Sequence, residues 1–559
     1  MVNIKEVSFQ LSAMLYMLLL PGKPSSSFGQ KMETWFIIIA SLCIAALFKS
    51  LFNLLSPTSP KPSKIKGKLP PGPSTVPIIG NFLWLWKSIS EIESILRNLH
   101  TKYGPLISLR FGSRLTIFIA SHSLAHQALI QNGVVFANRP AATPVGRIFS
   151  SNQHNVNSAA YGPVWRLLRR NLTSEILHHS RVKSYSHARR RVLCILVNLL
   201  KTSQSQKLGE PVQVMDHFQY AMFCLLVFMC FGEELEEKKI RDIEDVQRRP
   251  LLSIARFNIL NVWSRLGKIL FRSRWKELMQ MRKSQGDVLI PLIRDRMKAK
   301  LETQRKNMQD GEGKNESVLS YVDTFIDLKL PDEKRKLNEE EMVSLCSEFL
   351  NAGTDTTSTA LQWIMANLVK YPHIQEKLFA EINGVVGELG GGGPEEVKEE
   401  DLQKMPYLKA VILEGLRRHP PGHMVLPHAV TEDVTLDDYV VPKNAVVNFM
   451  VADMGWDPKV WEDPMAFKPE RFLSNGGDGE ELFDLTGSRE IKMMPFGAGR
   501  RICPGSGLAM LHLEYFVANL VWHFEWKAVD GDEVDLSEKQ EFTVVMKNPL
   551  QAHLSPRLK

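Results

Sequence analysis

The sequence contains few cysteines, and none of them forms a recognisable pair. The six cysteines in 559 residues lie at positions 43, 194, 224, 230, 346 and 503, with no CxxC spacing. A disulfide framework, a zinc ribbon or an iron–sulfur site needs cysteines close together, so this spacing argues against all three. A reducing compartment fits such usage, and any special role of Cys503 has to be argued from its surroundings.

Internal repeats, a phosphate-binding loop and a large charge excess are also missing. No segment recurs at a period of about 20 to 50 residues. The tetraglycine Gly390–Gly393 lacks a following Lys-Ser/Thr and is expected to be a surface loop. The 69 basic residues exceed the 61 acidic ones only slightly. Lysines near the N-terminus account for part of this excess, so a nucleic-acid partner is not needed to explain it. With 44% hydrophobic and 23% charged residues, the composition is that of a folded globular protein.

Only one hydrophobic run is long enough to cross a bilayer. Residues 35–55, WFIIIASLCIAALFKSLFNLL, provide 21 residues where about 20 span the hydrocarbon core. Five lysines and no acidic residue lie between Lys49 and Lys68, so the positive-inside rule places this flank in the cytosol. We therefore expect a single-pass transmembrane signal anchor over residues 32–55 rather than a cleaved signal peptide.

Two further segments flank this run. Residues 1–31 hold a 12-residue apolar stretch that is too short to span, and Met32 is a natural start, so we interpret them as a leader that is unstructured or not part of the native protein. N-terminal sequencing of the native protein tests this, and detection of Met1 or Val2 would contradict it. Residues 56–80 form a basic, proline-rich hinge in which PPGP (70–73) excludes a helix.

Residues 81–559 are expected to form one large domain, mainly α-helical with a minor β-sheet. Amphipathic helical patterns dominate this part of the chain. Residues 107–121, ISLRFGSRLTIFIAS, alternate as a hairpin would, and residues 433–454 predict further strands. Polar breaks at 304–317, 387–401 and 474–481 are short enough to be surface loops.

A long helix is predicted through the centre of this domain. Asn338 and Glu341 indicate a capping box, and the helix can run to Lys370 before Pro372 stops it, a length of about 48 Å. Its middle, AGTDTTSTA (352–360), is rich in residues that helix interiors disfavour. Threonine hydroxyls there can divert backbone hydrogen bonds and open a local bulge, or the helix can simply be kinked, and the sequence leaves both open.

Three charged residues further along are candidates for one ion-pair network. Glu414 and Arg417 in LEGLRRHPPG lie three apart near the end of a helix that follows Pro406. Most such pairs are solvated. Arg471 in FKPERF is flanked by phenylalanines, which favours a buried bidentate partner for Glu414.

The stretch PFGAGRRICPG (495–505) makes Cys503 the most informative cysteine. Its glycines permit a tight loop and close backbone approach, and a helical pattern starts directly after it. Arg500, Arg501 and the helix dipole are expected to lower the pKa of the thiol and favour a thiolate. A thiolate can act as a nucleophile, with His512 the nearest histidine in sequence, or as a metal ligand. No protease-like signature accompanies it, and a single thiolate suits an iron held by a macrocycle.

Together with these motifs, the sequence resembles the cytochrome P-450 superfamily of haem-thiolate mono-oxygenases over nearly its full length. The matching motifs, in chain order, are the anchor with PPGP (70–73), WRLLR (165–169), AGTDTT (352–357), EGLR (414–417), PERF (469–472) and FGAGRRICPG (496–505). In detail it is similar to the plant endoplasmic-reticulum type, plant family eighty-nine, subfamily A. The resemblance implies the triangular, helix-rich haem domain of this superfamily behind the N-terminal anchor.

The resemblance also implies a cofactor, haem b (iron protoporphyrin IX), and a role for each matching residue. Cys503 would be the axial ligand of the haem iron, which favours O–O bond cleavage. Glu414, Arg417 and Arg471 would form a structural network behind the haem, and Asp355 and Thr356 would relay protons to the bound oxygen. The remaining cofactor-binding residues would be Phe496, Gly497, Trp165, Arg169, His428 and Arg501, the last four at the propionates, with His428 where many relatives carry arginine.

The implied reaction inserts one oxygen atom from O2 into an apolar or amphipathic small molecule, as in plant secondary metabolism. Electrons would come from NADPH through a separate flavoprotein, NADPH–cytochrome reductase, because the chain has no dinucleotide fingerprint of its own. The enzyme would be a monomeric catalytic unit facing the cytosol from the endoplasmic reticulum membrane, with no nucleic-acid partner. Substrate contacts are expected from residues 136–160, from the helix near Ala352 and from residues 541–550. A haem-thiolate isomerase or dehydratase that needs no reductase, and a non-catalytic haem-binding membrane protein, are the alternatives.

Overall fold

The computed structural model describes residues 38, 41–42, 67–74, 89–111, 114–206, 210–262, 266–310, 318–331, 334–387, 396–473, 483–529 and 533–557. The chain divides into two units, Met1–Lys64 and Ile65–Lys559, and the helices from α3 to α19 and the strands from β1 to β11 lie in the second. The predicted leader, nearly all of the anchor, most of the hinge and the tetraglycine lie outside the described residues. None of the helices in the described ranges qualifies as a membrane span by its length and hydropathy.

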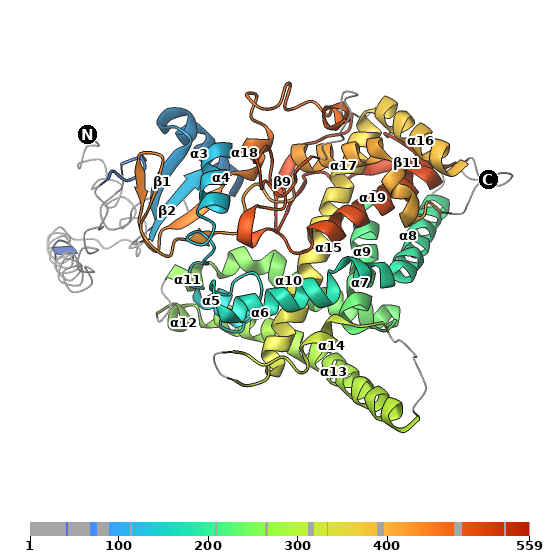
Figure 1. Cartoon of the computed structure of the whole chain (residues 1–559), viewed down its shortest axis with the longest axis horizontal. Helices are drawn as coiled ribbons and strands as arrows, with labels where there is room; N and C mark the ends of the chain where they lie inside the picture. The colour runs from blue at the N-terminus through green and yellow to red at the C-terminus, as the bar shows by residue number, and fades with distance from the viewer. Residues whose placement is uncertain are drawn as a thin grey trace, which may run out of the picture. The chain divides into compact units, whose positions relative to one another are not determined.

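Helices make up most of the second unit, as predicted (Figure 1). Their bounds are α3 Ile89–Tyr103, α4 His122–His126, α5 Pro144–Phe149, α6 Pro163–Asn171, α7 His179–Ser184, α8 Ser186–Gln206, α9 Met215–Phe231, α10 Glu237–Ser253, α11 Ile259–Val262, α12 Leu266–Leu270, α13 Arg272–Asp310, α14 Tyr321–Phe325, α15 Glu339–Lys370, α16 Pro372–Val386, α17 Pro406–Arg418, α18 Val451–Gly455 and α19 Ser506–His523. The polar break predicted from residue 304 begins later, because α13 continues to Asp310 through residues with strong helix propensity.

The strands are short and form small sheets. Their bounds are β1 Leu106–Phe111, β2 Arg114–Ile119, β3 Val212–Gln213, β4 His428–Ala429, β5 Val434–Leu436, β6 Tyr439–Val441, β7 Val446–Phe449, β8 Phe524–Lys527, β9 Glu538–Gln540, β10 Val544–Met546 and β11 Gln551–Pro556. The largest sheet has the order β1-β2-β7-β4, with β1 and β2 paired as the predicted hairpin. The strands predicted within 433–454 are β5, β6 and β7, but residues 451–455 form α18 instead. Strands β9 and β10 form a separate hairpin that lies against α15 (Figure 1).

The long helix α15 runs through the middle of the second unit, beside α9 (Figure 1). Helix α9 is apolar on nearly every side, as expected for a helix enclosed by others. A Cβ at Gly353 of α15 would lie only 2.6 Å from Leu226 Cδ1 of α9, so this glycine allows the two helices to pack closely. Close packing therefore explains a residue that helix propensity alone disfavours.

The predicted capping box at the start of α15 is confirmed. The Glu341 N–H donates to Asn338 Oδ1 at 2.9 Å, and the Asn338 N–H donates to Glu341 Oε2 at 2.8 Å. Burial favours a raised pKa for Glu341, but hydrogen bonds from Arg335, the Asn338 N–H and His154 outweigh it and lower the pKa to about 2.

The local bulge considered for the middle of α15 does not occur. The helix is continuous from Glu339 to Lys370. The Thr356 and Ser358 hydroxyls donate to the carbonyls four residues earlier, at 2.6 and 2.9 Å, in addition to the helical backbone bonds. The hydroxyls are therefore satisfied without opening the helix.

Candidate active site

The cysteine-containing loop is folded by contacts within the protein. The Cys503 N–H donates to Phe496 O at 2.9 Å, and Gly497 and Gly499 have φ of 71° and 68°, which glycine adopts readily. A Cβ at Gly499 would lie 2.1 Å from Leu129 O, so the close backbone approach that this glycine permits is to the protein itself. Helix α19 begins three residues after Cys503, as predicted.

The prediction that Arg500 and Arg501 lower the pKa of the Cys503 thiol is wrong. Burial raises this pKa, and it outweighs the Gly505 N–H and the charge of Arg169, which lower it. Arg500 is exposed, and Arg501 donates to backbone carbonyls instead. A cation bound directly to the sulfur would supply the missing positive charge.

Three of the predicted cofactor-binding residues lie together beside this loop. The Arg501 guanidinium is 4.4 Å from the centre of the Trp165 ring, and it donates to Ala137 O and Ala159 O at 2.7 Å each. Arg169 follows Trp165 by one turn on α6 and donates to the carbonyl of the residue before Cys503 at 2.6 Å. Trp165 is buried, and no described residue accepts a hydrogen bond from its Nε1.

The positive charges in this region are crowded. Burial, together with the charges of neighbouring arginines such as Arg169, lowers the pKa of Arg139 to about 10 and that of Arg501 to about 9. Glu348 is the carboxylate that acts on both, but burial raises its own pKa to about 7. Arg139, Arg169 and Arg501 are thus three neighbouring cations with little negative charge to balance them, which favours an anionic ligand. Sequence reasoning missed Arg139 because neither helical spacing nor a motif marks it.

His428 differs from the other predicted propionate contacts. Its buried ring places Nδ1 2.7 Å from Phe136 O. Burial, with a smaller effect from Arg139, lowers its pKa to about 3, so the ring is neutral and Nδ1–H donates to this carbonyl. Its Nε2 is then an acceptor, and His428 adds no positive charge to the site.

The middle of α15 is exposed at one residue and is connected by hydrogen bonds to the cysteine loop. Ala352 is exposed although buried turns lie on both sides of it, and Thr356, one turn later, is half-buried. Glu348, one turn earlier, accepts the Val156 N–H at 2.8 Å, and Val156 O accepts from Arg501 at 3.3 Å. These contacts tie the open face of α15 to the loop that carries Cys503.

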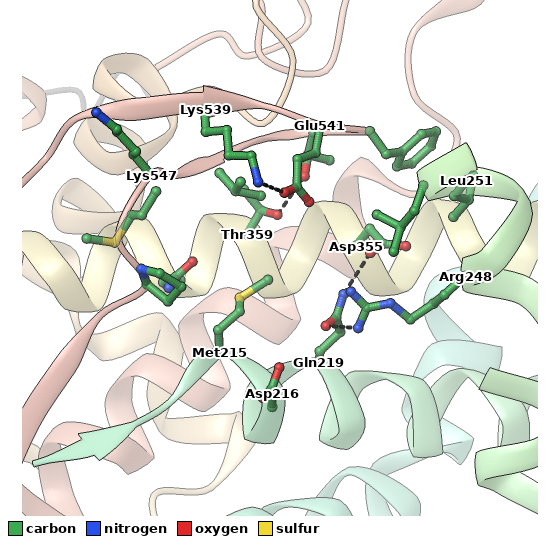
Figure 2. A pocket seen from close by; sticks show the side chains of 17 residues that line it. Met215, Asp216, Gln219, Arg248, Leu251, Asp355, Thr359, Lys539, Glu541 and Lys547 are labelled. Carbon is green, nitrogen blue, oxygen red and sulfur yellow. Dashed lines mark hydrogen bonds and ion pairs between the residues drawn. The ribbon is translucent and has the colours of Figure 1, made fainter. Parts of the chain in front are cut away.

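Asp355 lines a separate pocket of about 270 Å³ between α9, α10, α15 and the β9–β10 hairpin (Figure 2). Gln219 Nε2 donates to Asp355 Oδ1 at 2.8 Å, and Gln219 accepts from Arg248. Burial raises the pKa of Asp355, opposed by the charge of Arg248 and the bond from Gln219. Sequence reasoning found Asp355 but not its partners, because they come from two other helices.

The structure brings the three residues of the predicted ion-pair network together. Arg417 donates to both oxygens of Glu414, at 2.7 and 2.8 Å, and Arg471 Nε donates to Glu414 Oε1 at 3.2 Å. The Glu414 and Arg417 side chains are 0% exposed, so this pair is not the solvated kind that the spacing alone favours.

The family model for cytochrome P450 matches residues 70–555. The chain belongs to the cytochrome P450 family. Cytochrome P450 89A9 of Arabidopsis thaliana is 50% identical over 533 residues, which cover 94% of this chain and 99% of that protein. Isoflavone 3'-hydroxylase of Medicago truncatula is 32% identical over 87% of this chain and 92% of its own length. The predicted similarity to P450 family eighty-nine and the predicted enzyme class, a P450 mono-oxygenase, are confirmed.

A solved structure shares the fold. The zebra fish cytochrome P450 with abiraterone matches with a TM-score of 0.64 and 21% identity, covering 83% of this chain and 100% of that chain. The predicted helix-rich P450 fold with a minor sheet is thereby confirmed for the part of the chain that the structure describes.

The residues beside Cys503 fit the haem that the P450 family implies. Haem offers an iron cation to the buried thiol of Cys503 and two propionates to the surrounding donors. Trp165 Nε1 is a buried donor without a partner among the described residues, and Arg139, Arg169 and Arg501 need an anion. The donor set therefore matches both charges of the cofactor.

Proposed function

We propose that this P450 inserts one oxygen atom from O2 into an apolar or amphipathic small molecule, with electrons from NADPH delivered by a separate flavoprotein reductase. One observation carries the proposal. Ala352 is exposed in the middle of α15 and accepts the Thr356 hydroxyl, and Glu348, one turn earlier, is connected through Val156 to Arg501 of the Cys503 loop, which supports a substrate beside an oxygen-handling group.

The proposal gives each group in the loop region a separate task. Cys503 would hold the haem iron through its thiolate, and the haem would supply oxygen activation when bound. Arg169, Arg501 and the Trp165 indole hold the propionates through charge-assisted hydrogen bonds, and Arg139 adds positive charge beside them. Phe496 and Gly497 hold the loop in position through the backbone. The Glu414 network fixes α17 to the segment carrying Arg471 and so supports the loop from behind.

Asp355 and Thr356 move protons in this proposal. Asp355 lies at the edge of the open pocket and has a raised pKa, so it can take up a proton there and release it again. Thr356 follows Asp355 in the helix and holds its hydroxyl on the carbonyl of the exposed Ala352, from where it can pass a proton to the bound oxygen. Gln219 and Arg248 keep the Asp355 carboxylate turned to the pocket until it is protonated.

The reductase would dock on the face that carries the cysteine loop. Arg166, Arg170 and Arg500 are exposed there, and their charge suits an acidic flavoprotein surface. We further propose that the anchor over residues 32–55 holds the enzyme in the endoplasmic reticulum membrane, with the haem domain in the cytosol as a monomeric unit. Residues 1–31 remain a proposed leader, residues 56–80 a hinge and residues 81–559 the catalytic domain.

The reduced, carbon-monoxide-bound absorption spectrum of the full-length protein tests the iron ligand. A Soret band typical of thiolate ligation is expected in the wild type and should be absent in Cys503→Ala. Retention of this band in Cys503→Ala would overturn the assignment.

Oxygen uptake with NADPH and a plant reductase, measured against a metabolite panel, tests the reaction. Substrate-dependent uptake with one labelled oxygen atom in the product is expected. Product formation without reductase would favour an isomerase or dehydratase, and haem binding without turnover on any compound would favour a non-catalytic haem protein.

A further inference from the structure

The segment that joins α5 to α6 contains a strained stretch. Ser151, Asn152 and Gln153 have φ of 46°, 60° and 68°, in the left-handed region that residues other than glycine rarely adopt. Such a conformation persists only where the surrounding contacts determine it, and it is concentrated at functional sites. The contacts of residues 151–157 therefore indicate what the strain is for.

One face of α15 supplies contacts to this segment. Ser151 Oγ lies 2.7 Å from Ser344 Oγ, and His154 Nδ1 lies 2.5 Å from Glu341 Oε1. Glu348 continues the same face, because Glu341, Ser344 and Glu348 follow one another at spacings of three and four residues. Helix α15 thus holds the segment over about two turns.

Glu348 binds the backbone of the segment. Its Oε2 accepts the Val156 N–H at 2.8 Å, and its Oε1 accepts the Asn157 N–H at 2.6 Å. Hydrogen bonds to a carboxylate are strong, and two of them side by side fix orientation as well as distance. Glu348 therefore determines how the peptide group between Val156 and Asn157, the 156–157 peptide, is turned.

The 156–157 peptide connects Glu348 to Arg501. Its N–H, from Asn157, donates to Glu348, and its carbonyl, from Val156, accepts from Arg501 Nη1 at 3.3 Å. Since a peptide group is planar, a contact that fixes the N–H also fixes the carbonyl. The carboxylate at one end and the guanidinium at the other polarise the peptide in the same sense, which strengthens both hydrogen bonds.

Arg139 is held at the same place. Its Nε donates to Asn157 O at 2.8 Å, one peptide further along. Burial lowers the pKa of Arg139 and of Arg501, and the charge of Glu348 opposes this lowering in both. Glu348 therefore acts on the two arginines by charge and through the backbone.

We infer that Glu348 is a positioning residue for the haem, which acts through the 156–157 peptide to orient Arg501 and Arg139 toward the propionates. The strained stretch then serves to bring this peptide between α15 and the arginines. The inference rests on the proposed function and adds a residue that none of the family motifs contains, since Glu348 lies four residues before AGTDTT (352–357).

Glu348→Gln tests the inference, with Glu381→Gln as its matched control. Glu381 of α16 is also half-buried and also accepts two consecutive N–H groups, those of Tyr407 and Leu408, at 2.8 Å each. Glutamine has one acceptor oxygen and one NH2 group, so in each variant one backbone N–H loses its partner. Glu381 holds the start of α17 in this way, whereas Glu348 holds the peptide beside the arginines.

The rate of haem transfer from the full-length holoenzyme to excess apomyoglobin measures how firmly the cofactor is held. The assay is run at pH 8 to keep Glu348 ionised, because burial raises its pKa to about 7. We expect transfer roughly tenfold faster from Glu348→Gln, the lower end of the effect of losing a partner that orients a cofactor ligand. Glu381→Gln should stay within about twofold of the wild type.

Resonance Raman spectroscopy of the same samples separates positioning from general stability. The propionate bending band depends on the hydrogen bonds that the propionates receive. It should shift in Glu348→Gln and keep the wild-type frequency in Glu381→Gln. Urea unfolding should show a similar loss of stability in both variants, because each leaves one N–H without its acceptor.

Glu348→Asp provides a second route to the same band. It keeps the charge, but its carboxylate is one methylene short of the two N–H groups, so the band should again shift. This variant decides the test if Glu348→Gln does not fold.

Two results would overturn the inference. One is a wild-type transfer rate and a wild-type band in the Glu348 variants, and the other is an equal change in Glu381→Gln. Failure of the proposed function is distinguishable, because oxygen uptake tests the reaction and neither haem transfer nor the Raman band requires turnover. A wild type that binds no haem would overturn both.

Discussion

Replacing Glu414 by glutamine removes one charge from a buried network and leaves the rest of the network in place. The carboxylate receives two hydrogen bonds from Arg417, one from Arg471 Nε and one from the Lys468 N–H at 2.8 Å. Arg417 cannot lose its own charge and remains 0% exposed. In Glu414→Gln this cation is buried without a counter-charge of its own in the network.

The expected loss follows from the burial. Breaking a buried pair by removing one partner costs about 3–5 kcal/mol. Proteins are stable by about 5–15 kcal/mol, so the variant should lose a large share of its free energy of unfolding. Because Arg417 also donates to Gly455 O at 2.6 Å and Pro464 O at 2.8 Å, the loss should fall near the lower end of the range.

Glu339→Gln is the matched control. Arg294 also binds Glu339 through two hydrogen bonds, at 2.7 and 2.9 Å, but the Glu339 side chain is 45% exposed. Water replaces the lost contacts there, so the control should unfold at nearly the wild-type denaturant concentration. The two variants share the chemical change and differ in burial.

Urea unfolding of the holoenzyme, followed by far-UV circular dichroism and by the Soret band, measures both variants. Glu414→Gln should unfold, and lose its Soret band, at a much lower urea concentration than the wild type. Equal behaviour of the two variants, or wild-type stability of Glu414→Gln, would refute the assignment of this stability to burial of the ion pair.

Three further predictions concern other parts of the site and fold. Thr356→Ala should lower the amount of product formed per NADPH consumed. Thr354→Ala should not, because the buried Thr354 hydroxyl has no partner among the described residues. Equal effects of the two substitutions would contradict the proton-transfer role of Thr356. Trp165→Phe keeps an aromatic ring at this position but loses the indole donor to a charged group, worth about 1.5–3 kcal/mol, so haem should transfer to excess apomyoglobin at least tenfold faster. An unchanged transfer rate would exclude a propionate contact. The lowered pKa of Glu341 contributes stability that is present above about pH 4.5 and is lost as the pH falls towards 2. The free energy of unfolding of Glu341→Gln should therefore fall less steeply than that of the wild type between about pH 4.5 and 2. An unchanged pH profile would contradict this.

Features with local causes were predictable from the sequence. The capping box of Asn338 and Glu341 depends on residues three apart, and both hydrogen bonds occur as the spacing predicts. The β1–β2 hairpin follows from alternation over a short segment, and α17 begins at Pro406 where the sequence indicates. In each case the residues that determine the structure are close in the chain.

Features that depend on burial were not predictable in the same way. Glu414 and Arg417 have the spacing of a common surface pair, and only the packing around α17 makes the pair costly to break. The thiol of Cys503 shows the opposite error. The sequence places two arginines before it, but a side chain three residues from a helix start can still be dominated by desolvation, and the nearest effective cation, Arg169, comes from α6.

The exposed Ala352 in the middle of α15 connects these observations. A propensity scale marks residues 352–360 as unfavourable for a helix, yet α15 is continuous, because Gly353 meets Leu226 of α9 and the Thr356 hydroxyl stays on the helix. The unfavourable composition therefore does not interrupt α15. It leaves the small Ala352 exposed and the Thr356 hydroxyl half-buried in the middle of the helix, so the residues that weaken the helix by propensity are the ones to which we assign substrate contact and proton transfer.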